Sequence, residues 1–223
     1  MTARKRWLVG TAVLALLLYA LLWVGFVEHW RWIDATDRFA LDALHSYGIA
    51  HPGWVTAWDV FCTVAGPTVF RLVALGVILG ALVQRNLRAA LFLVITVELS
   101  GVLSEAAKAA ADRPRPAEAL VDASSTSFPS GHAVGVMVGV LALSAVVLPI
   151  VRRPVWVWLI AVGVVIVVAI GVGRVVLSVH HVSDVLAGWA LGYVWFVVCA
   201  LLVRPVVPIR AADETPAAPG SSP

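Results

Sequence analysis

The chain has 223 residues, of which 61% are hydrophobic and 13% are charged, and its formal net charge at pH 7 is +3. A mean hydropathy of +0.95 and 10 tryptophans exclude an ordinary soluble domain and are typical of a membrane protein. The two cysteines, Cys62 and Cys199, lie in apolar surroundings without a CxxC pair, which argues against a disulfide framework or a zinc knuckle.

Six apolar runs are long enough to cross the roughly 30 Å of hydrocarbon in a bilayer. In chain order they cover 7–27, 66–83, 87–107, 131–151, 154–174 and 182–203. The first run follows three basic residues but lacks a cleavage site of the A-x-A type, so we interpret it as an uncleaved anchor. The sequence therefore predicts an all-α, polytopic membrane bundle with six transmembrane helices.

The segment 28–65, between the first two runs, has a mixed composition. Its stretch WIDATDRFALDALHSYG predicts an amphipathic helix on the outer membrane surface, and its tryptophans suit that interface. The C-terminal stretch AADETPAAPGSSP has too little apolar surface to offset the entropy of ordering. We expect a membrane-embedded domain over 1–205 and a disordered cytoplasmic tail over 206–223.

Basic residues gather on one side of the six-span arrangement. They are Arg4, Lys5, Arg6, Arg85, Arg88, Arg152, Arg153, Arg204 and Arg210. Because cytoplasmic loops are enriched in Lys and Arg, both termini are predicted to be cytoplasmic. The segments 28–65, 108–130 and 174–181 are then predicted to share the extracytoplasmic face of a cell-membrane protein.

Three polar clusters converge on that outer face. They are KAAADRPRP (108–116), FPSGH (128–132) and GRVVLSVHHVSD (173–184). Pro114 and Pro116 prevent the helix of Lys108 from continuing and hold Arg113 and Arg115 on an extended segment. Ionisable groups cost about 2.5–3.5 kcal/mol each in hydrocarbon, so their accumulation at one depth indicates a function.

In FPSGH, Ser130 is the expected N-cap of the helix that follows. The free backbone N–H groups and the positive end of the helix dipole favour a bound anion there. Gly131 leaves room for an oxyanion, and His132 follows within reach of it. This cluster therefore predicts a phosphate or sulfate site.

His180 and Asp184 are four residues apart and are expected to share a helix face, where the carboxylate would hold the imidazole tautomer. Arg174 lies about 240° from His180 on a continuous helix, so the two meet only if the chain turns between them. Lys108, Arg115 and Arg174 would neutralise an oxyanion, while histidines supply nucleophilic and acid–base chemistry. This set favours phosphoryl over acyl transfer, because a phosphoryl group carries charge on several oxygens.

The three patterns together resemble the motifs of the type 2 phosphatidic acid phosphatase superfamily in order and residue type. They are Lys108-x6-Arg115-Pro116, Pro129-Ser130-Gly131-His132 and Arg174-x5-His180-x3-Asp184. The resemblance covers the core from about 66 to 203. Gly173 departs from it, because the family usually has serine before the motif arginine, and the lost hydroxyl is expected to weaken the phosphate site.

The resemblance implies a metal-independent lipid phosphatase that needs no cofactor. His180 would attack phosphorus, Asp184 would orient it, and His132 would protonate the leaving alkoxide and later activate the water that releases a phosphohistidine. The residues implied in phosphate binding are Lys108, Arg115, Ser130, Gly131 and Arg174.

The substrates implied by the resemblance are membrane lipids that carry phosphate or diphosphate. They include phosphatidic acid, phosphatidylglycerophosphate and polyprenyl diphosphates. The lipid bilayer and such a lipid are the expected partners, and no nucleic acid is expected. The sequence carries no signal for an oligomeric state.

Two other functions stay open on the residues alone. A non-enzymatic carrier could bind lipid phosphates through the same cations, without needing the His180–Asp184 pair. A zinc-dependent membrane hydrolase could use His132, His180 and Asp184, although the neighbouring Lys and Arg side chains would repel a dication. Removal of metal would separate the last alternative.

Several single residues also have structural interpretations. Glu98, in the third run, has an available ion-pair partner in Arg71, about one turn inside the second run, and a role in a substrate pocket is the alternative. Arg113 could pair with Asp112 instead of phosphate. His181 is interpreted as an anchor at the membrane interface.

Overall fold

The computed structural model describes residues 2–203, and the regular elements in that range are helical. In chain order they are α1 (Ala3–Val27), α2 (Arg31–Ala50), α3 (Pro52–Val64), α4 (Pro67–Val83), α5 (Leu87–Leu93), the π-turn η1 (Val94–Glu98), α6 (Ser100–Ala111), α7 (Gly131–Val147), the 3-10 turn η2 (Leu148–Ile150), α8 (Arg153–Val176) and α9 (Val182–Val203). The predicted tail over 206–223 lies outside the described residues.

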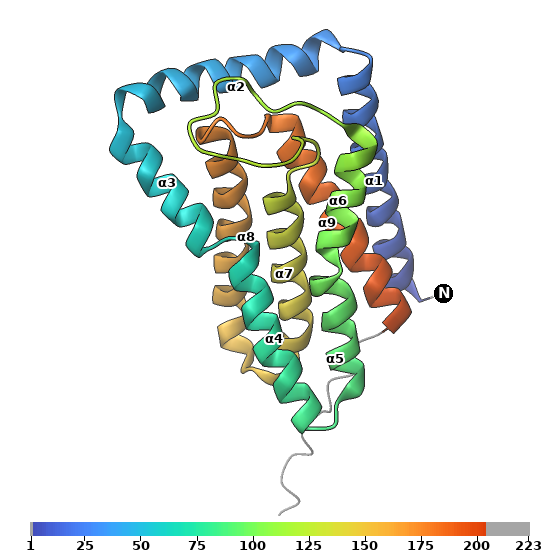
Figure 1. Cartoon of the computed structure of the whole chain (residues 1–223). Coiled ribbons are helices and arrows are strands. Elements are labelled where there is room, and N and C mark those ends of the chain that lie inside the picture. Colours follow the sequence, from blue (N-terminus) through green and yellow to red (C-terminus); the bar gives the residue numbers. More distant parts are fainter. Residues whose placement is uncertain (1, 204–223) are drawn as a thin grey trace, which may run out of the picture.

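The helices form six segments long and apolar enough to cross a membrane, which confirms the predicted all-α membrane bundle. They are 3–27, 52–83, 87–111, 131–150, 153–176 and 182–203. The second segment corrects the prediction, because it begins at Pro52 instead of residue 66. Figure 1 shows α3 descending beside the bundle and α4 continuing it, so only part of 28–65 lies across the end. Pro67 lacks an N–H group and starts a new helix there.

The predicted amphipathic helix is α2, which lies across one end of the bundle (Figure 1). Its buried residues include Ile33, Asp37 and Leu41, which follow one another at four-residue spacing and so form one face. Two of the three are apolar, but the middle one is a carboxylate. A cover of this kind places an acidic side chain against the end of the bundle.

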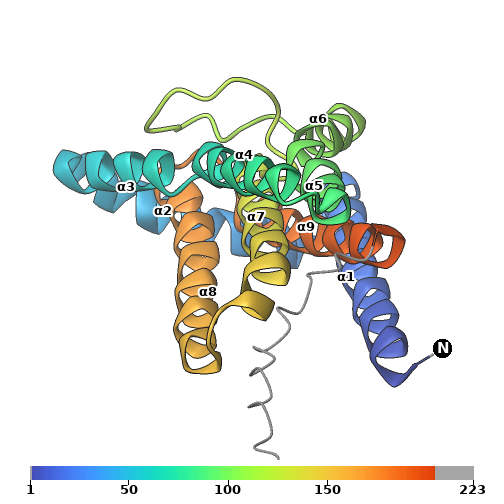
Figure 2. The ribbon, with the colours of Figure 1, turned by 90° about the horizontal axis from the view of Figure 1, so that it is seen from below.

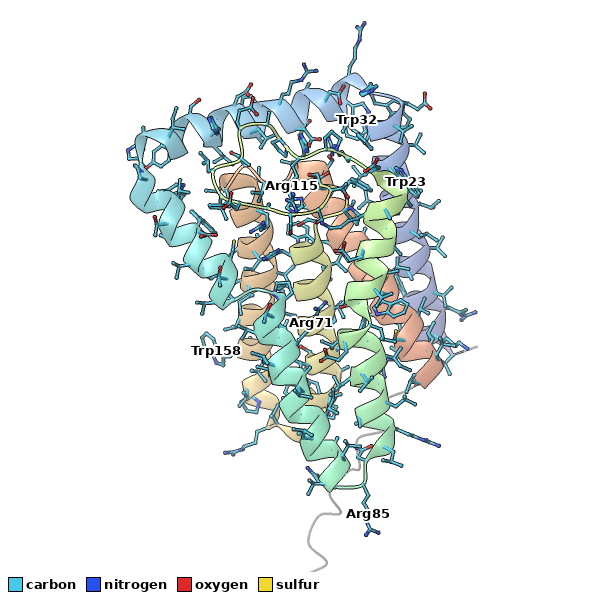
Figure 3. The ribbon with its side chains drawn as sticks, viewed as in Figure 1. Trp23, Trp32, Arg71, Arg85, Arg115 and Trp158 are labelled. Atoms are coloured by element: carbon cyan, nitrogen blue, oxygen red, sulfur yellow. The ribbon has the colours of Figure 1, made fainter. Side chains whose placement is uncertain are left out.

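The flanks of the bundle expose large apolar side chains. Leu14 of α1, Val102 of α6 and Trp158 of α8 are 67%, 68% and 73% exposed. Trp158 points outward from α8 (Figure 3). Because soluble proteins rarely expose such extensive apolar surface, these flanks face hydrocarbon, and the chain is a multi-pass membrane protein.

Helix α7 occupies the centre of the bundle, with α4, α8 and α9 around it (Figure 2). It approaches α9 closely at Gly188, where an added Cβ would lie 2.7 Å from the Ser130 carbonyl oxygen and 2.7 Å from the Ala133 Cβ. In addition, the Ser130 N–H donates to the Asp184 carbonyl oxygen at 3.0 Å. The first turns of α7 and α9 are therefore locked side by side.

The predicted clustering of basic residues at one end agrees with the arrangement of the helices. Arg85, between α4 and α5, lies at the end of the bundle opposite α2 (Figure 3). The turn between α7 and α8, which precedes Arg153, lies toward that same end (Figure 1). The loop 112–130 lies at the other end, which is also the end of α2 (Figure 1).

Candidate active site

The loop 112–130, the end of α6, the start of α7 and the α8–α9 turn surround a cavity of about 400 Å³ at the α2 end of the bundle. Its walls carry most of the predicted site residues, which come from all three motifs. They include Lys108, Arg115, Gly131, His132, Arg174 and His180. The fold thus brings together three cations and two histidines that are widely separated in the sequence.

The loop folds back onto the first motif. Helix α6 ends where Asp112 adopts a left-handed conformation with a φ of 45°. Lys108 Nζ donates to Ser125 Oγ and to the Thr126 carbonyl oxygen, both at 2.8 Å. Arg115 Nε donates to the Ser125 carbonyl oxygen, also at 2.8 Å. As predicted from the prolines, residues 113–116 are not helical. Lys108 and Arg115 both line the cavity.

The predicted turn between Arg174 and His180 is confirmed, because the segment 177–181 separates α8 from α9. Ser178, at a φ of 52°, contributes to this change of direction. The expectation that His180 and Asp184 share one helix is wrong, since α9 begins after His180. The pair still meets: His180 Nδ1 lies 3.6 Å from Asp184 Oδ2.

The hydrogen bonds around His180 assign its tautomer. Arg115 Nη1 lies 3.2 Å from His180 Nε2. Because a guanidinium can only donate, Nε2 must accept and carries the free lone pair. The ring proton is then on Nδ1, which faces Asp184 and lies 3.4 Å from Ser127 Oγ. Burial lowers the pKa of His180 from 6.5 to about 4, outweighing the opposing effect of Asp184, so the ring is neutral at pH 7.

Asp184 is completely buried, and both of its carboxylate oxygens accept hydrogen bonds. Oδ1 accepts from Arg113 Nη1 at 2.6 Å, while Oδ2 accepts from Ser127 Oγ at 2.5 Å and from the His181 N–H at 2.8 Å. His181 Nδ1 also lies 3.2 Å from Oδ2, so this histidine packs against the site and is not simply an interface anchor. These donors offset the cost of burying a carboxylate.

Among the described residues, Arg113 forms ion pairs with two buried carboxylates, and neither of them is Asp112. One is Asp184; the other is Asp37 of α2, whose Oδ2 accepts from Arg113 Nη2 at 2.9 Å. Asp37 also accepts from the Ser183 N–H at 2.9 Å and from Ser183 Oγ at 2.6 Å. Sequence reasoning missed Asp37, and its only signal was a carboxylate at an apolar position of the amphipathic pattern.

Ser130 is the N-cap of α7, as predicted, and its Oγ accepts from the Ala133 N–H at 3.5 Å. Its side chain is buried, whereas Gly131 and His132 line the cavity. An added Cβ at Gly131 would lie 3.2 Å from Ser104 Oγ, so the space between α6 and α7 is narrow there. Phosphate binding by Ser130 and Gly131 stays a prediction.

The structure gives a packing reason for Gly173 at the position where the resembled family has serine. An added Cβ would lie 2.6 Å from Cys62 Sγ and 2.8 Å from Trp58 Cε3. Helix α3 therefore occupies the space that a serine side chain would need. Arg174 next to it is 7% exposed and lines the cavity, and its buried Nε has no hydrogen-bond partner among residues 2–203.

The ion pair predicted between Arg71 and Glu98 is not formed in the described part of the chain. The buried Nε of Arg71 and the buried Oε1 of Glu98 both lack a hydrogen-bond partner. Both side chains instead line a second cavity between α4 and α6. The structure thus places Arg71 and Glu98 in a pocket, which is the alternative to a structural ion pair.

Comparison with known proteins agrees with the geometry. The undecaprenyl-diphosphatase of Sulfolobus acidocaldarius is 32% identical over 88 residues, which cover 40% of this chain and 38% of that protein, so the match spans well under half of the relative. A transmembrane PAP2-type phosphatidylglycerolphosphate phosphatase from Bacillus subtilis, known from a crystal structure, shares the fold. The TM-score is 0.75, with 24% identity over 90% of this chain and 99% of that chain. Residues 89–207, more than half of the chain, match the family model of the PAP2 superfamily, and the chain belongs to that superfamily.

Proposed function

We propose that this protein is an integral-membrane phosphatase that hydrolyses a lipid phosphate or diphosphate through a phosphohistidine at His180, without a metal ion. The observation that carries the proposal is the contact of Arg115 Nη1 with His180 Nε2 at 3.2 Å. It leaves the nucleophilic lone pair of a neutral imidazole facing a cation in the cavity. A phosphate oxygen bound by that cation would bring phosphorus to Nε2.

The charge of the cavity suits a phosphoryl group. Lys108, Arg115 and Arg174 line it together, and the Nε of Arg174, which has no partner in the part of the chain that the structure describes, is a donor available to an oxyanion. In phosphoryl transfer the negative charge is spread over three equatorial oxygens, so several fixed cations stabilise the transition state. The relatives named as lipid-phosphate and lipid-diphosphate phosphatases support the same reaction class.

The reaction would proceed in two steps. His180 Nε2 forms a bond to phosphorus, the bond from phosphorus to the leaving oxygen breaks, and His132 gives its proton to that oxygen. Asp184, near Nδ1, stabilises the positive charge that develops on the ring. Water then attacks the phosphohistidine, His132 takes the proton of that water, and phosphate leaves with His180 restored.

We also propose that the site faces the extracytoplasmic side and that both termini are cytoplasmic. The support is the position of the basic turn residues at the end of the bundle opposite the cavity, because such residues accumulate on the cytoplasmic side. A lipid phosphate of the outer leaflet would then lie at the depth of the site.

The buried arrangement around His180 favours an enzyme over the two alternatives. A lipid-phosphate carrier would need the cations but not a fully buried carboxylate behind a neutral imidazole. A zinc hydrolase would use an imidazole nitrogen as a ligand, whereas here Arg115 lies against Nε2 and would repel a dication.

Phosphate release by the purified protein in detergent tests the proposal. The substrates are a panel of lipid phosphates and diphosphates, each assayed with and without EDTA and vanadate. We expect activity that survives EDTA and is inhibited by vanadate, that is absent in His180→Gln, and that persists in His51→Gln, an exposed histidine of the α2–α3 junction. Equal release by His180→Gln, or loss on chelation with recovery on adding zinc, would contradict it.

A further inference from the structure

A second cavity, of about 780 Å³, lies between α4, α6 and the start of α7. Glu105, Gly131 and His132 line both this cavity and the catalytic one, so the two are neighbours that share a wall. Arg71 of α4 lines it at a greater distance from α2 than Arg115 (Figure 3). The cavity therefore extends from the candidate active site toward the middle of the bundle.

Arg71 and Glu98 are ionisable groups inside candidate membrane spans, where such groups are costly and usually functional. Arg71 packs against Gly101 of α6, where an added Cβ would lie 2.5 Å from Arg71 Nη2. The buried Nε of Arg71 and Oε1 of Glu98 have no hydrogen-bond partner. The cavity thus contains a donor and an acceptor that are not satisfied by the described part of the protein.

The backbone places Glu98 at this point. The segment 87–111 is interrupted by the π-turn Val94–Glu98, which ends at that residue. Trp195 Nε1 of α9 donates to the Thr96 carbonyl oxygen at 2.9 Å and so satisfies an acceptor within the interruption. π-turns inside α-helices often occur at functional sites, because they change the direction of the side chains that follow.

The charges of the cavity select an uncharged polar group. Arg71 can donate hydrogen bonds, but Glu98 and Glu105 on the same walls would repel a second phosphate or a carboxylate. Gly101, against which Arg71 packs, is seven residues from Lys108 and therefore roughly 10 Å away along the helix. Below the phosphate of a glycerolipid, the next hydrogen-bond acceptors along the molecule are the carbonyl oxygens of its acyl esters.

We propose that this cavity is a subsite for the acyl-ester region of a glycerolipid phosphate, in which Arg71 donates to an ester carbonyl oxygen. This inference rests on the proposed lipid phosphatase function and adds to it a residue, Arg71, that determines specificity among the lipid phosphates. A prenyl phosphate or an ether lipid has no such acceptor and leaves the Arg71 donors unpaired. Because hydrogen bonds to charged groups are strong, the absence of the ester lowers kcat/KM by about 10- to 100-fold.

The test compares three substrates with one phosphate each: a diacylglycerol phosphate, the matching dialkylglycerol phosphate with ether links, and a prenyl phosphate. The full-length protein in mixed micelles should turn over the diester lipid with the highest kcat/KM. Arg71→Met should lower that value by about 10- to 100-fold, to the level of the diether lipid, and leave the other two substrates nearly unchanged. Arg88→Met, on the exposed surface of α5, is the matched control and should retain the full preference.

Three results would overturn the inference. The first is hydrolysis of the diester and diether lipids by the wild-type protein with equal kcat/KM. The second is a decrease of kcat/KM by the same factor for all three substrates in Arg71→Met, which would indicate a general role in packing or phosphate binding. If the wild-type protein releases phosphate from none of these three monophosphates, the inference fails, whereas the proposed function fails only if the lipid diphosphates of the earlier panel are not hydrolysed either. Equal vanadate inhibition of Arg71→Met and wild type on the ether lipid is expected, since the phosphate site is intact.

Discussion

Arg113 Nη1 donates to Asp184 Oδ1 at 2.6 Å, and the two side chains are 7% and 0% exposed. The same guanidinium donates through Nη2 to Asp37, so one cation lies between two buried carboxylates from α2 and α9. Asp184, the carboxylate next to His180, is therefore connected through Arg113 to the surface helix α2. Loss of either partner leaves a buried charge without compensation.

Arg113→Met should destabilise the protein by about 3–5 kcal/mol, because it leaves both carboxylates unpaired. Unfolding in detergent, followed by the apparent melting temperature, measures this. Adding Asp37→Asn to Arg113→Met should recover part of the loss, since one uncompensated charge is removed. Arg38→Met, at an exposed arginine next to Asp37 in sequence, is the control and should change stability by less than about 0.5 kcal/mol. Equal losses of stability in Arg113→Met and Arg38→Met would show that the ion pairs of Arg113 are not responsible.

The site could be predicted from the sequence as far as its residues are tied to motifs. Lys108, Arg115, His132, Arg174 and His180 line one cavity because each follows or precedes a helix end that hydropathy alone could locate. Each of these positions depends on local signals, such as a proline or the end of an apolar run.

The features of the site and fold that could not be predicted depend on contacts between segments far apart in the chain. Asp37 reaches Arg113 across 76 residues, and nothing in the amphipathic pattern of α2 names its partner. Likewise, Gly173 was interpreted as a lost hydroxyl, because the packing of Trp58 and Cys62 against it cannot be read from sequence. Helix α3 was missed as part of the second apolar segment, since the mixed composition of 28–65 hid the start of that segment at Pro52.

The low pKa of His180 makes the free energy of unfolding depend on pH in a defined direction. Between pH 6.5 and about 4, the unfolded chain binds a proton at this residue and the folded chain does not. Stability should therefore fall as the pH drops through this window, by up to about 3 kcal/mol. The melting temperature of wild type relative to His180→Gln, which cannot be protonated there, should decrease from pH 6.5 to 4. A relative increase would mean that Asp184 raises the pKa above its ordinary value.

Replacement of Gly173 by serine should not improve the enzyme. The new side chain meets Cys62 Sγ and Trp58, and overpacking of this kind costs about 1–3 kcal/mol. Gly173→Ser should lower the melting temperature, and Cys62→Ala in the same chain should restore part of it by removing the nearest atom. A serine variant as stable as wild type would show that α3 does not fill this space.

The orientation can be tested by cysteine labelling in intact cells with a membrane-impermeant reagent. Asp122 in the loop 112–130 and Arg152 before α8 are both exposed, and the two native cysteines are buried. Asp122→Cys should be labelled from outside, and Arg152→Cys only after the membrane is opened. The reverse pattern would place the site in the cytoplasm.

The most direct measurement of the central claim traps the covalent intermediate on His132→Ala. With an aryl phosphate, whose leaving group needs no proton, His180 can still attack, but the hydrolysis step lacks its general base and slows by about 10²–10⁴-fold. A rapid quench with ³²P-labelled aryl phosphate should therefore find label that accumulates on this variant, is acid-labile and base-stable, and maps to His180. A phosphohistidine mechanism at His180 would be contradicted if label is absent or is stable to acid. It would also be contradicted if label persists in the double variant that combines His132→Ala with His180→Gln.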